Sequence, residues 1–356
     1  MTWLLNFSAS PAGGGWRRLE ETAKWFDGHG GATFLIHPAV LGSVSKWSET
    51  NRFIAISQSK LRRLFADGQY LPPIVSELGR PDIYFSYGIP VFYGVGRINW
   101  FHVSNSLTLT RHRHGMPLKR YLELQLLGRR TILSLRNAQI ASAESEFAVG
   151  LLKDRAGAGA GIKQYVVLNN GCEDSLFCSQ QLPERENTEP YAVTVGTSPY
   201  KRLGLALEVF AQLQAQNPNL RTLKIVGDKR QIPSSVLMDR RVEALGSGLD
   251  NEVLYQLLRG AEYYISTSGI ENSSTAVSEG LLLSKKVVLS DIPSHREAIK
   301  GLAVSYVDVP SKGRFVEVNK VGAQAIVPTP SWSDVLAKLH EVAAEALRSS
   351  QRPTDS

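Results

Sequence analysis

Cysteine and long apolar segments are scarce in this sequence. Its 356 residues include two cysteines, Cys172 and Cys178, whose spacing fits neither a C-x-x-C motif nor a zinc site. So few cysteines in so long a chain are typical of a reducing compartment. No apolar run approaches the roughly 20 residues that a membrane-spanning helix needs, and the N-terminal residues lack the basic start of a secretory signal. We therefore expect a cytoplasmic protein.

Signatures of metal and nucleic-acid binding are also missing. The chain contains no D-x-D pair and no cluster of histidine, cysteine and carboxylate residues at ligand spacing, so we expect no bound metal and no other cofactor. Zinc-finger and helix-turn-helix patterns do not occur, and aromatic and basic residues do not interleave as they do in proteins that stack bases. The sequence therefore argues against a nucleic-acid partner.

The composition indicates a globular protein, and its charge is distributed unevenly along the chain. A hydrophobic content of 43% in a chain of this length is enough for two domains with separate cores. The first 180 residues contain 20 Lys+Arg and 13 Asp+Glu, a net charge of +7, whereas the remainder is neutral. Basic clusters lie at residues 60–63 and, more loosely, from Arg111 to Arg130. They suit an anionic membrane surface or another anionic partner, and a merely soluble basic face fits equally well.

Short β-prone apolar runs alternate with helical patterns along the first half of the chain. We expect strands at Trp3–Phe7, Phe34–His37, Phe53–Ser57 and Asp82–Ser86, and a helix at Leu61–Ala66. This alternation predicts parallel sheets covered by helices, which defines an α/β fold.

A glycine-rich loop is expected directly after the first strand, before a helix that begins at about Trp16. Gly13, Gly14 and Gly15 would allow the backbone of this loop to approach a phosphate closely. The loop matches neither the Rossmann fingerprint nor the P-loop, because the required third glycine and the Lys-Ser/Thr pair are absent. A plain tight turn is an equally good interpretation.

A histidine, His102, lies near the end of an expected apolar strand, Asn99–Val103. Open α/β sheets bind their ligands at the carboxyl ends of their strands, so His102 is a candidate site residue. A histidine that anchors the following turn through a backbone hydrogen bond would produce the same pattern.

The segment 261–283 predicts a strand, a polar turn and a helix that carries two carboxylates. Four cap-forming or turn-forming residues, Asn272, Ser273, Ser274 and Thr275, precede the helical pattern. The free backbone N–H groups at such a helix start would bind a phosphate. Glu271 and Glu279 flank these residues in the spacing E-x7-E, which also arises by chance in chains of this length.

The run S-G-I-E-N-S-S-T-A-V-S-E-G-L in this segment resembles the donor-site signature of the retaining GT-B glycosyltransferases. Residues 196–202 resemble that family's G-R-x-x-P-Y-K-R segment, with Thr197 in place of the arginine and one residue fewer. His102 is similar to the histidine that many members place beside the transferred sugar, although Val103 separates it from the polar residues that follow. From Asn170 to Ala298 the expected segments occur in the family's order, whereas the resemblance of the first half is thinner.

The resemblance implies a GT-B architecture, in which two Rossmann-like domains face each other across a cleft. Residues 1–180 would form the acceptor-binding domain and residues 181–332 the donor-binding domain, joined by a polar linker at 182–190. Residues 333–356 would form a C-terminal helix that packs back on the body.

The resemblance also implies roles for individual residues. His102, Glu271 and Lys201 would act at the reacting sugar, and the lysine would meet the donor diphosphate. The expected donor-binding residues are Gly13, Gly14, Gly15, Gly196, Lys201, Arg202, Gly227, Asn272, Ser273, Ser274, Thr275 and Glu279. Lys201 and Arg202 could equally be a solvated pair in a turn.

The function expected from these observations is retaining, metal-independent transfer of a hexose from a nucleotide-sugar to a glycan or lipid-linked glycan. Assembly of a bacterial surface polysaccharide such as lipopolysaccharide would fit, at the inner face of the plasma membrane. A sugar epimerase or phosphorylase on the same fold, a subunit that binds nucleotide-sugars without catalysis, and a basic nucleic-acid-binding protein remain alternatives. The epimerase would need further acid and base residues that the sequence does not show.

Overall fold

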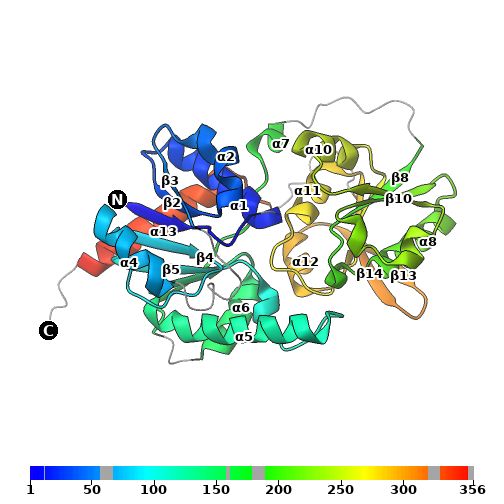
Figure 1. Ribbon diagram of the computed structural model, residues 1–356. Coiled ribbons are helices and arrows are strands. Elements are labelled where there is room, and N and C mark those ends of the chain that lie inside the picture. Colours follow the sequence, from blue (N-terminus) through cyan, green and yellow to red (C-terminus); the bar gives the residue numbers. More distant parts are fainter. Residues whose placement is uncertain (12, 57–66, 158–160, 179–188, 320–328, 352–356) are drawn as a thin grey trace. The chain divides into compact units, whose positions relative to one another are not determined.

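The computed structural model describes residues 1–11, 13–56, 67–157, 161–178, 189–319 and 329–351. The chain forms two compact units (Figure 1). Unit 1 comprises Met1–Arg111, Leu118–Asn170 and Trp332–Ser356, and unit 2 comprises His112–Pro117 and Gly171–Ser331. The expected helix at Leu61–Ala66 and most of the expected linker lie outside the described residues, as does the basic cluster at residues 60–63.

Unit 1 is built on a seven-stranded parallel sheet in the order β3-β2-β1-β4-β5-β6-β7. Its strands are β1 (Trp3–Asn6), β2 (Thr33–Ile36), β3 (Arg52–Ala55), β4 (Ile83–Tyr87), β5 (Ile98–Val103), β6 (Ile140–Ala143) and β7 (Gln164–Val167). Its helices are α1 (Gly13–Asp27), α2 (Leu41–Val44), α4 (Asp67–Leu78), α5 (Leu118–Ser134), α6 (Glu146–Ala156) and α13 (Trp332–Gln351).

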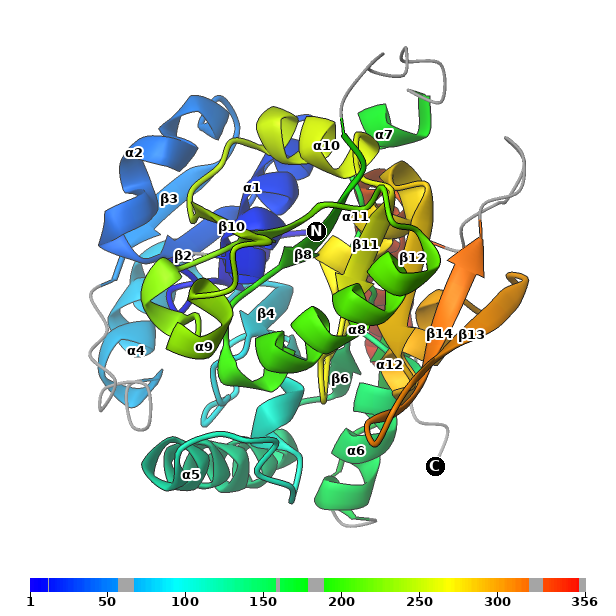
Figure 2. The ribbon, with the colours of Figure 1, turned by 90° about the vertical axis from the view of Figure 1, so that its right-hand side faces the viewer.

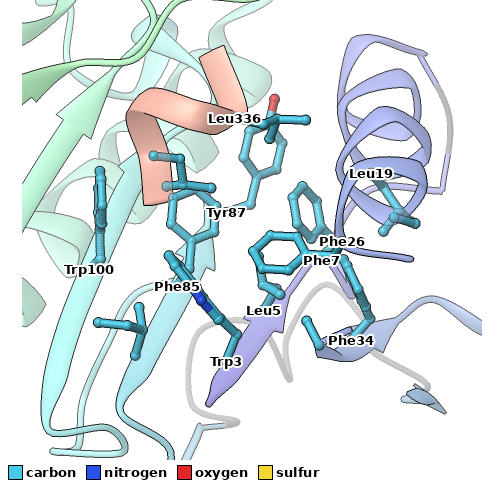
Figure 3. Close-up of a cluster of buried hydrophobic side chains, with 14 of the residues drawn as sticks. Trp3, Leu5, Phe7, Leu19, Phe26, Phe34, Phe85, Tyr87, Trp100 and Leu336 are labelled. Carbon is cyan, nitrogen blue, oxygen red and sulfur yellow. The ribbon is translucent and has the colours of Figure 1, made fainter. Parts of the chain in front are cut away.

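Two hydrophobic layers cover the faces of this sheet. On one face the aromatic side chains of β1, β2 and β4 pack against α1 and α13. Figure 3 shows Phe34 of β2 and Phe85 of β4 in this layer, together with Phe26 of α1. On the other face, residues of α4 and α6 cover the sheet. Burial on both faces explains why the strands have continuous apolar runs rather than alternating patterns.

Unit 2 contains a second seven-stranded sheet, in the order β10-β9-β8-β11-β12-β14-β13. Its strands are β8 (Tyr191–Val195), β9 (Thr222–Val226), β10 (Val242–Gly246), β11 (Tyr263–Ser266), β12 (Lys286–Ser290), β13 (Val304–Val309) and β14 (Gly313–Asn319). Its helices are α7 (Asp174–Cys178), α8 (Leu203–Gln216), α9 (Ser234–Leu237), α10 (Asn251–Arg259), α11 (Thr275–Leu283) and α12 (Pro293–Ala298).

The first five of these strands run parallel, and β13 and β14 add an antiparallel pair at one edge. Helix α8 packs on one face of the sheet (Figure 2), and α10 and α11 pack on the other. The alternation of strands and helices along the first half of the chain therefore predicted the parallel α/β architecture of unit 1 correctly.

In each unit the strand order reverses next to the first strand. This reversal determines where the sheet can bind a ligand. In unit 2 the chain leaves β8 toward β9 and later returns to β11 on the other side of β8. In unit 1 the same reversal occurs between β1 and β4. The loops that follow the two central strands of such a sheet diverge and leave a crevice, which is where open α/β sheets bind ligands.

One local prediction was wrong. Gly13, Gly14 and Gly15 do not form a loop but the first turn of α1. His102 lies one residue before the end of β5, as expected, and its side chain is fully buried.

Candidate active site

The candidate site lies in unit 2, where the loops after β8 and β11 meet. The chain leaves β8 at Gly196 and forms a short 3₁₀ turn, η5 (Pro199–Lys201), before α8 begins. After β11 it continues through Thr267 and Ser268 to Glu271. Both loops therefore lie at the carboxyl ends of the two strands between which the strand order reverses.

A buried ion pair joins the two loops. The Lys201 Nζ atom lies 2.5 Å from the Glu271 Oε1 atom, and the two side chains are only 13% and 10% exposed. The Ser268 hydroxyl donates a second hydrogen bond, 2.6 Å long, to the same carboxylate oxygen. Burial alone would lower the pKa of Lys201, but Glu271, with help from the neighbouring tyrosines, raises it above its ordinary value. Lys201 therefore carries a permanent positive charge at this point.

Hydrogen bonds from side chains to backbone carbonyls connect the two loops. Arg202 donates through Nε to the carbonyl of Thr267 at 2.6 Å and through Nη2 to that of Ser268 at 2.9 Å. In return, the Thr267 hydroxyl donates to the carbonyl of Lys201 at 2.8 Å. Arg202, which the sequence assigned to donor binding, thus serves to fix the backbone beside Lys201.

Two glycines make room for this arrangement. Gly196 has φ +97°, and a Cβ atom there would lie 2.9 Å from the Lys201 Cε atom, so the lysine side chain packs over it. Gly227, at the end of β9, has φ +150°, and a Cβ atom there would lie 2.6 Å from the Thr197 side chain. Thr197, which replaces the arginine of the resembled motif, is accordingly buried against Gly227.

The helix α11 begins at Thr275, four residues after Glu271, as the cap-forming residues predicted. Ser274 is its N-cap, and its side chain accepts a hydrogen bond from the backbone N–H of Val277. Ser273, Ser274 and Thr275 are partly exposed, so the positive end of the helix dipole is accessible. A permanent cation and a helix N-terminus on adjacent loops form a chemically suitable place for a diphosphate.

The second glutamate of the pattern, Glu279, lies on α11 and is only 1% exposed. The charge of Glu279 contributes to raising the pKa of Tyr264 of β11. Burial is the main cause of this upward shift of the Tyr264 pKa, and the positive charge of Lys201 opposes it. The ring of Tyr264 packs against Gly280, where a Cβ atom would lie 2.6 Å from it.

A buried histidine completes the site on the β12 side. His295 of α12 is 2% exposed, and its Nδ1 atom lies 2.8 Å from the carbonyl oxygen of Ser290. The pKa of His295 falls to about 4, mainly because of burial, although the nearby Glu271 opposes this shift. The ring is therefore neutral near pH 7, and Nε2 has no partner among the described residues. Nδ1–H must donate to the carbonyl, which leaves Nε2 as an acceptor.

The other predicted catalytic residue, His102, belongs to a buried polar cluster in unit 1. Its Nε2 atom lies 3.2 Å from Arg18 Nη1, and its Nδ1 atom lies 2.8 Å from the Ser142 hydroxyl. Because arginine can only donate, Nε2 is the acceptor and the ring is neutral. Burial, followed by the charge of Arg18, holds the pKa of His102 well below its usual range. Both ring nitrogens are therefore engaged with protein groups in this conformation.

Arg18 is the centre of this cluster, although it is only 2% exposed. Its Nη2 atom donates to the carbonyls of Leu168, at 3.0 Å, and Asn169. Its guanidinium also lies 5.7 Å from the ring centroid of Tyr87 and 5.5 Å from that of Trp332. Arg18 thus links α1 to β4 and β5, to the residues that follow β7 and to the first residue of α13.

The glycines at the start of α1 are placed differently from the expectation. Gly13 has φ +68° and Gly14 has open space around its Cα atom. Gly15 is closely packed, since a Cβ atom there would lie 2.8 Å from the Ser10 hydroxyl and 3.2 Å from the ring of Tyr87. Only Gly15 is therefore required by packing.

The structure brings together ten of the residues that the sequence selected, all in unit 2. They are Gly196, Lys201, Arg202, Gly227, Glu271, Asn272, Ser273, Ser274, Thr275 and Glu279. His102 and the three glycines of α1 belong to unit 1. Sequence reasoning missed Tyr264 of β11, Ser268, which lies two residues after β11, and His295 of α12. The available signal was that Ser268 belongs to the loop after β11 and that His295 belongs to the segment after β12.

Within the described ranges, no group of three or more His, Cys, Asp or Glu side chains could hold a metal ion. Within the same ranges, no helix is long and apolar enough to cross a membrane.

Comparison with known proteins defines the fold. No family model matches the chain, and no curated protein matches it in sequence. Solved structures, in contrast, match it over almost its full length, and they show that the fold is of the GT-B glycosyltransferase type. The fold class indicated by the sequence is therefore confirmed.

Three of these structures illustrate the similarity. HepE of Anabaena, solved with UDP and glucose, shares 16% identity and covers 98% of this chain and 91% of its own, with a TM-score of 0.57. Sucrose-phosphate synthase of Thermosynechococcus elongatus shares 13% identity over 84% of each chain, with a TM-score of 0.59. A glycosyltransferase of Rickettsia africae shares 15% identity and covers 98% of this chain and 93% of its own, with a TM-score of 0.58.

Proposed function

We propose that this protein is a retaining glycosyltransferase, which moves a hexose from a nucleotide-sugar to a glycan or lipid-linked glycan. The observation that carries the proposal is the buried Lys201–Glu271 pair, which lies at the carboxyl edge of the unit 2 sheet beside the start of α11. The similarity to HepE, which has been solved with UDP and with UDP-glucose, supports a nucleotide-sugar as the donor.

The charges of the site match the charge that develops in such a reaction. When the anomeric bond breaks, the leaving nucleoside diphosphate gains negative charge, which Lys201 and the N-terminal N–H groups of α11 would stabilise. Glu271 would hold sugar hydroxyls through Oε2, since Oε1 already accepts from Lys201 and Ser268. Glu279 would accept from the ribose hydroxyls, and its burial means that nucleotide binding must expose its carboxylate.

The proposal includes metal-independent catalysis, because a lysine and a helix N-terminus supply the positive charge that a divalent ion would otherwise provide. The basic composition of the first 180 residues supports an acceptor held at an anionic surface, such as a lipid-linked glycan of a bacterial surface polysaccharide. The enzyme would then work in the cytoplasm, at the inner face of the plasma membrane.

The test is a thermal-shift screen of UDP, other nucleoside diphosphates and their sugar conjugates, followed by transfer assays. A ligand present at a hundred times its dissociation constant stabilises the folded state by about 2.7 kcal/mol, which is easily measured. We expect one nucleotide class to stabilise the protein, and EDTA to leave both stabilisation and transfer unchanged. If no nucleotide stabilises the protein, the proposal is wrong. Stabilisation without transfer to any glycan would instead identify a binding subunit.

A further inference from the structure

The helix α5 exposes four leucines in one stripe. Leu118, Leu122, Leu126 and Leu133 are 57%, 57%, 50% and 55% exposed. At about 100° of rotation per residue, their positions fall within roughly 80° around the helix axis. The helix lies on the surface of unit 1 (Figure 1), so these leucines, with Arg129 between Leu126 and Leu133, form an exposed and mainly apolar strip on the surface of the described structure.

The opposite side of α5 is already used for packing. Leu124, Gly128 and Thr131 are buried, and a Cβ atom at Gly128 would lie 2.0 Å from the carbonyl oxygen of Thr108. The helix is thus fixed to the body by one face, and the leucine strip is a separate feature. Single exposed leucines are common on protein surfaces and need no explanation. Four of them on one side of a helix form a patch, and such patches mark interaction sites.

Basic side chains accompany the leucines. The helix contains Lys119, Arg120, Arg129 and Arg130 but only one acidic residue, Glu123, which gives it a net charge of +3. Glu123 is paired with Arg120 at 3.0 Å. Lys119 and Arg129 are exposed. A partner that binds this face of α5 therefore has to present both apolar groups and negative charge.

We propose that α5 lies in the interfacial region of an anionic lipid bilayer, with its leucines in the acyl boundary and its basic residues at the headgroups. A bilayer satisfies both features, as it does for other amphipathic helices with a basic polar face. A second copy of this chain would place like charges opposite each other across a two-fold interface. Nucleic acid would leave the leucines in water.

The inference deepens the proposed function, on which it rests for the lipid-linked acceptor. With 17 residues the helix is about 25 Å long. Its buried face and its charges require it to lie in the membrane plane rather than across it. The leucines of α5 are therefore the apolar part of the protein surface that contacts the membrane.

Flotation of the full-length protein with vesicles tests this assignment. We expect binding to phosphatidylcholine vesicles that contain phosphatidylglycerol, no binding to phosphatidylcholine alone, and weaker binding as salt is raised. Leu122→Gln/Leu126→Gln should reduce the bound fraction at least tenfold, and Lys119→Gln/Arg129→Gln should remove the preference for anionic vesicles. The matched control is Leu237→Gln/Val253→Gln, which changes apolar side chains of unit 2 that are 43% and 49% exposed and should not alter binding.

Three results would overturn the inference. The first is recovery of the wild-type protein in the soluble fraction with every vesicle. The second is equal vesicle binding by the wild type and Leu122→Gln/Leu126→Gln. The third is a wild-type dimer, measured by light scattering, that becomes a monomer in this variant, because a second copy would then cover the strip. Thermal shifts with UDP measure the proposed function separately: a variant that keeps its UDP shift but loses flotation has lost only the membrane surface.

Discussion

At the scale of single residues, the charges of Lys201 and Glu271 depend on each other. In Lys201→Met the Glu271 carboxylate stays buried without its partner, and breaking a buried pair in this way costs about 3–5 kcal/mol of stability. The same variant should weaken UDP binding at least tenfold, equivalent to about 1.4 kcal/mol, because a cation at the diphosphate position is lost. Urea unfolding and calorimetric titration with UDP measure the two effects.

A second ion pair of unit 2 provides the control for this prediction. Lys224 and Glu243 approach to 3.7 Å, but their side chains are 24% and 51% exposed. Lys224→Met should change stability by no more than about 1 kcal/mol and leave UDP binding intact, as is usual for surface pairs. If Lys201→Met behaved in the same way as Lys224→Met, the buried pair would have no role in the site.

Residues of the site differ in how well sequence reasoning could find them. Lys201 and Glu271 each lie in the loop that follows a strand, within a short pattern of turn and cap residues, so both could be selected from local sequence. Arg18 could not, because its partners Leu168 and Asn169 are about 150 positions away. For the same reason the sequence did not reveal that His102 is enclosed by Arg18.

At the scale of secondary-structure elements, the position of α11 depends on one glycine. A Cβ atom at Gly280 would lie 2.6 Å from the ring of Tyr264, so Gly280→Ala should push α11 away from β11. Overpacking of this kind typically destabilises by about 1–3 kcal/mol. Since α11 carries Glu279 and begins beside Glu271, UDP binding should weaken as well. Thermal unfolding with and without UDP measures both effects.

Gly204 of α8 is the matched control, because it is also a helical glycine but has no atom within 4 Å of its potential Cβ. Gly204→Ala should therefore be neutral or stabilise the protein by up to about 1 kcal/mol. A Gly280→Ala variant as stable as Gly204→Ala would show that the contact between α11 and β11 is not close.

Several elements were not evident from the sequence, for physical reasons. The strands β13 and β14 were missed because only some of their alternating residues are buried at the sheet edge. The helix α12 has only six residues, too few for a hydrophobic period. The glycines of α1 suggested a loop because glycine disfavours helix interiors, yet in the first turn they disturb few helical hydrogen bonds. The longer helix α13, which has a strong pattern, was predicted well.

At the scale of the whole molecule, the last helix of the chain completes the core of the first unit. Trp332, Leu336 and Leu339 of α13 are buried against residues of α1 and the unit 1 sheet. Figure 1 shows α13 in unit 1, far in sequence from the strands that it covers. Unit 1 therefore needs both ends of the chain, whereas Gly171–Ser331 supplies nearly all of unit 2.

This arrangement predicts that core variants act on one unit at a time. Leu336→Ala removes a side chain that is 3% exposed in unit 1, and Leu281→Ala removes one that is fully buried in unit 2. Each should cost about 2–5 kcal/mol in its own unit. Amide hydrogen exchange should then accelerate in β1 and β4 for Leu336→Ala, and in β8 and β11 for Leu281→Ala.

UDP distinguishes the two units in the same experiment. If the nucleotide binds at the Lys201–Glu271 site, it should slow exchange in β8 and β11 of both variants, because binding stabilises only the unit that forms the site. It should leave the accelerated exchange of β1 and β4 in Leu336→Ala unchanged. Equal acceleration in all four strands for either variant would mean that the two units unfold as one, and that the stability of the site cannot be assigned to unit 2 alone.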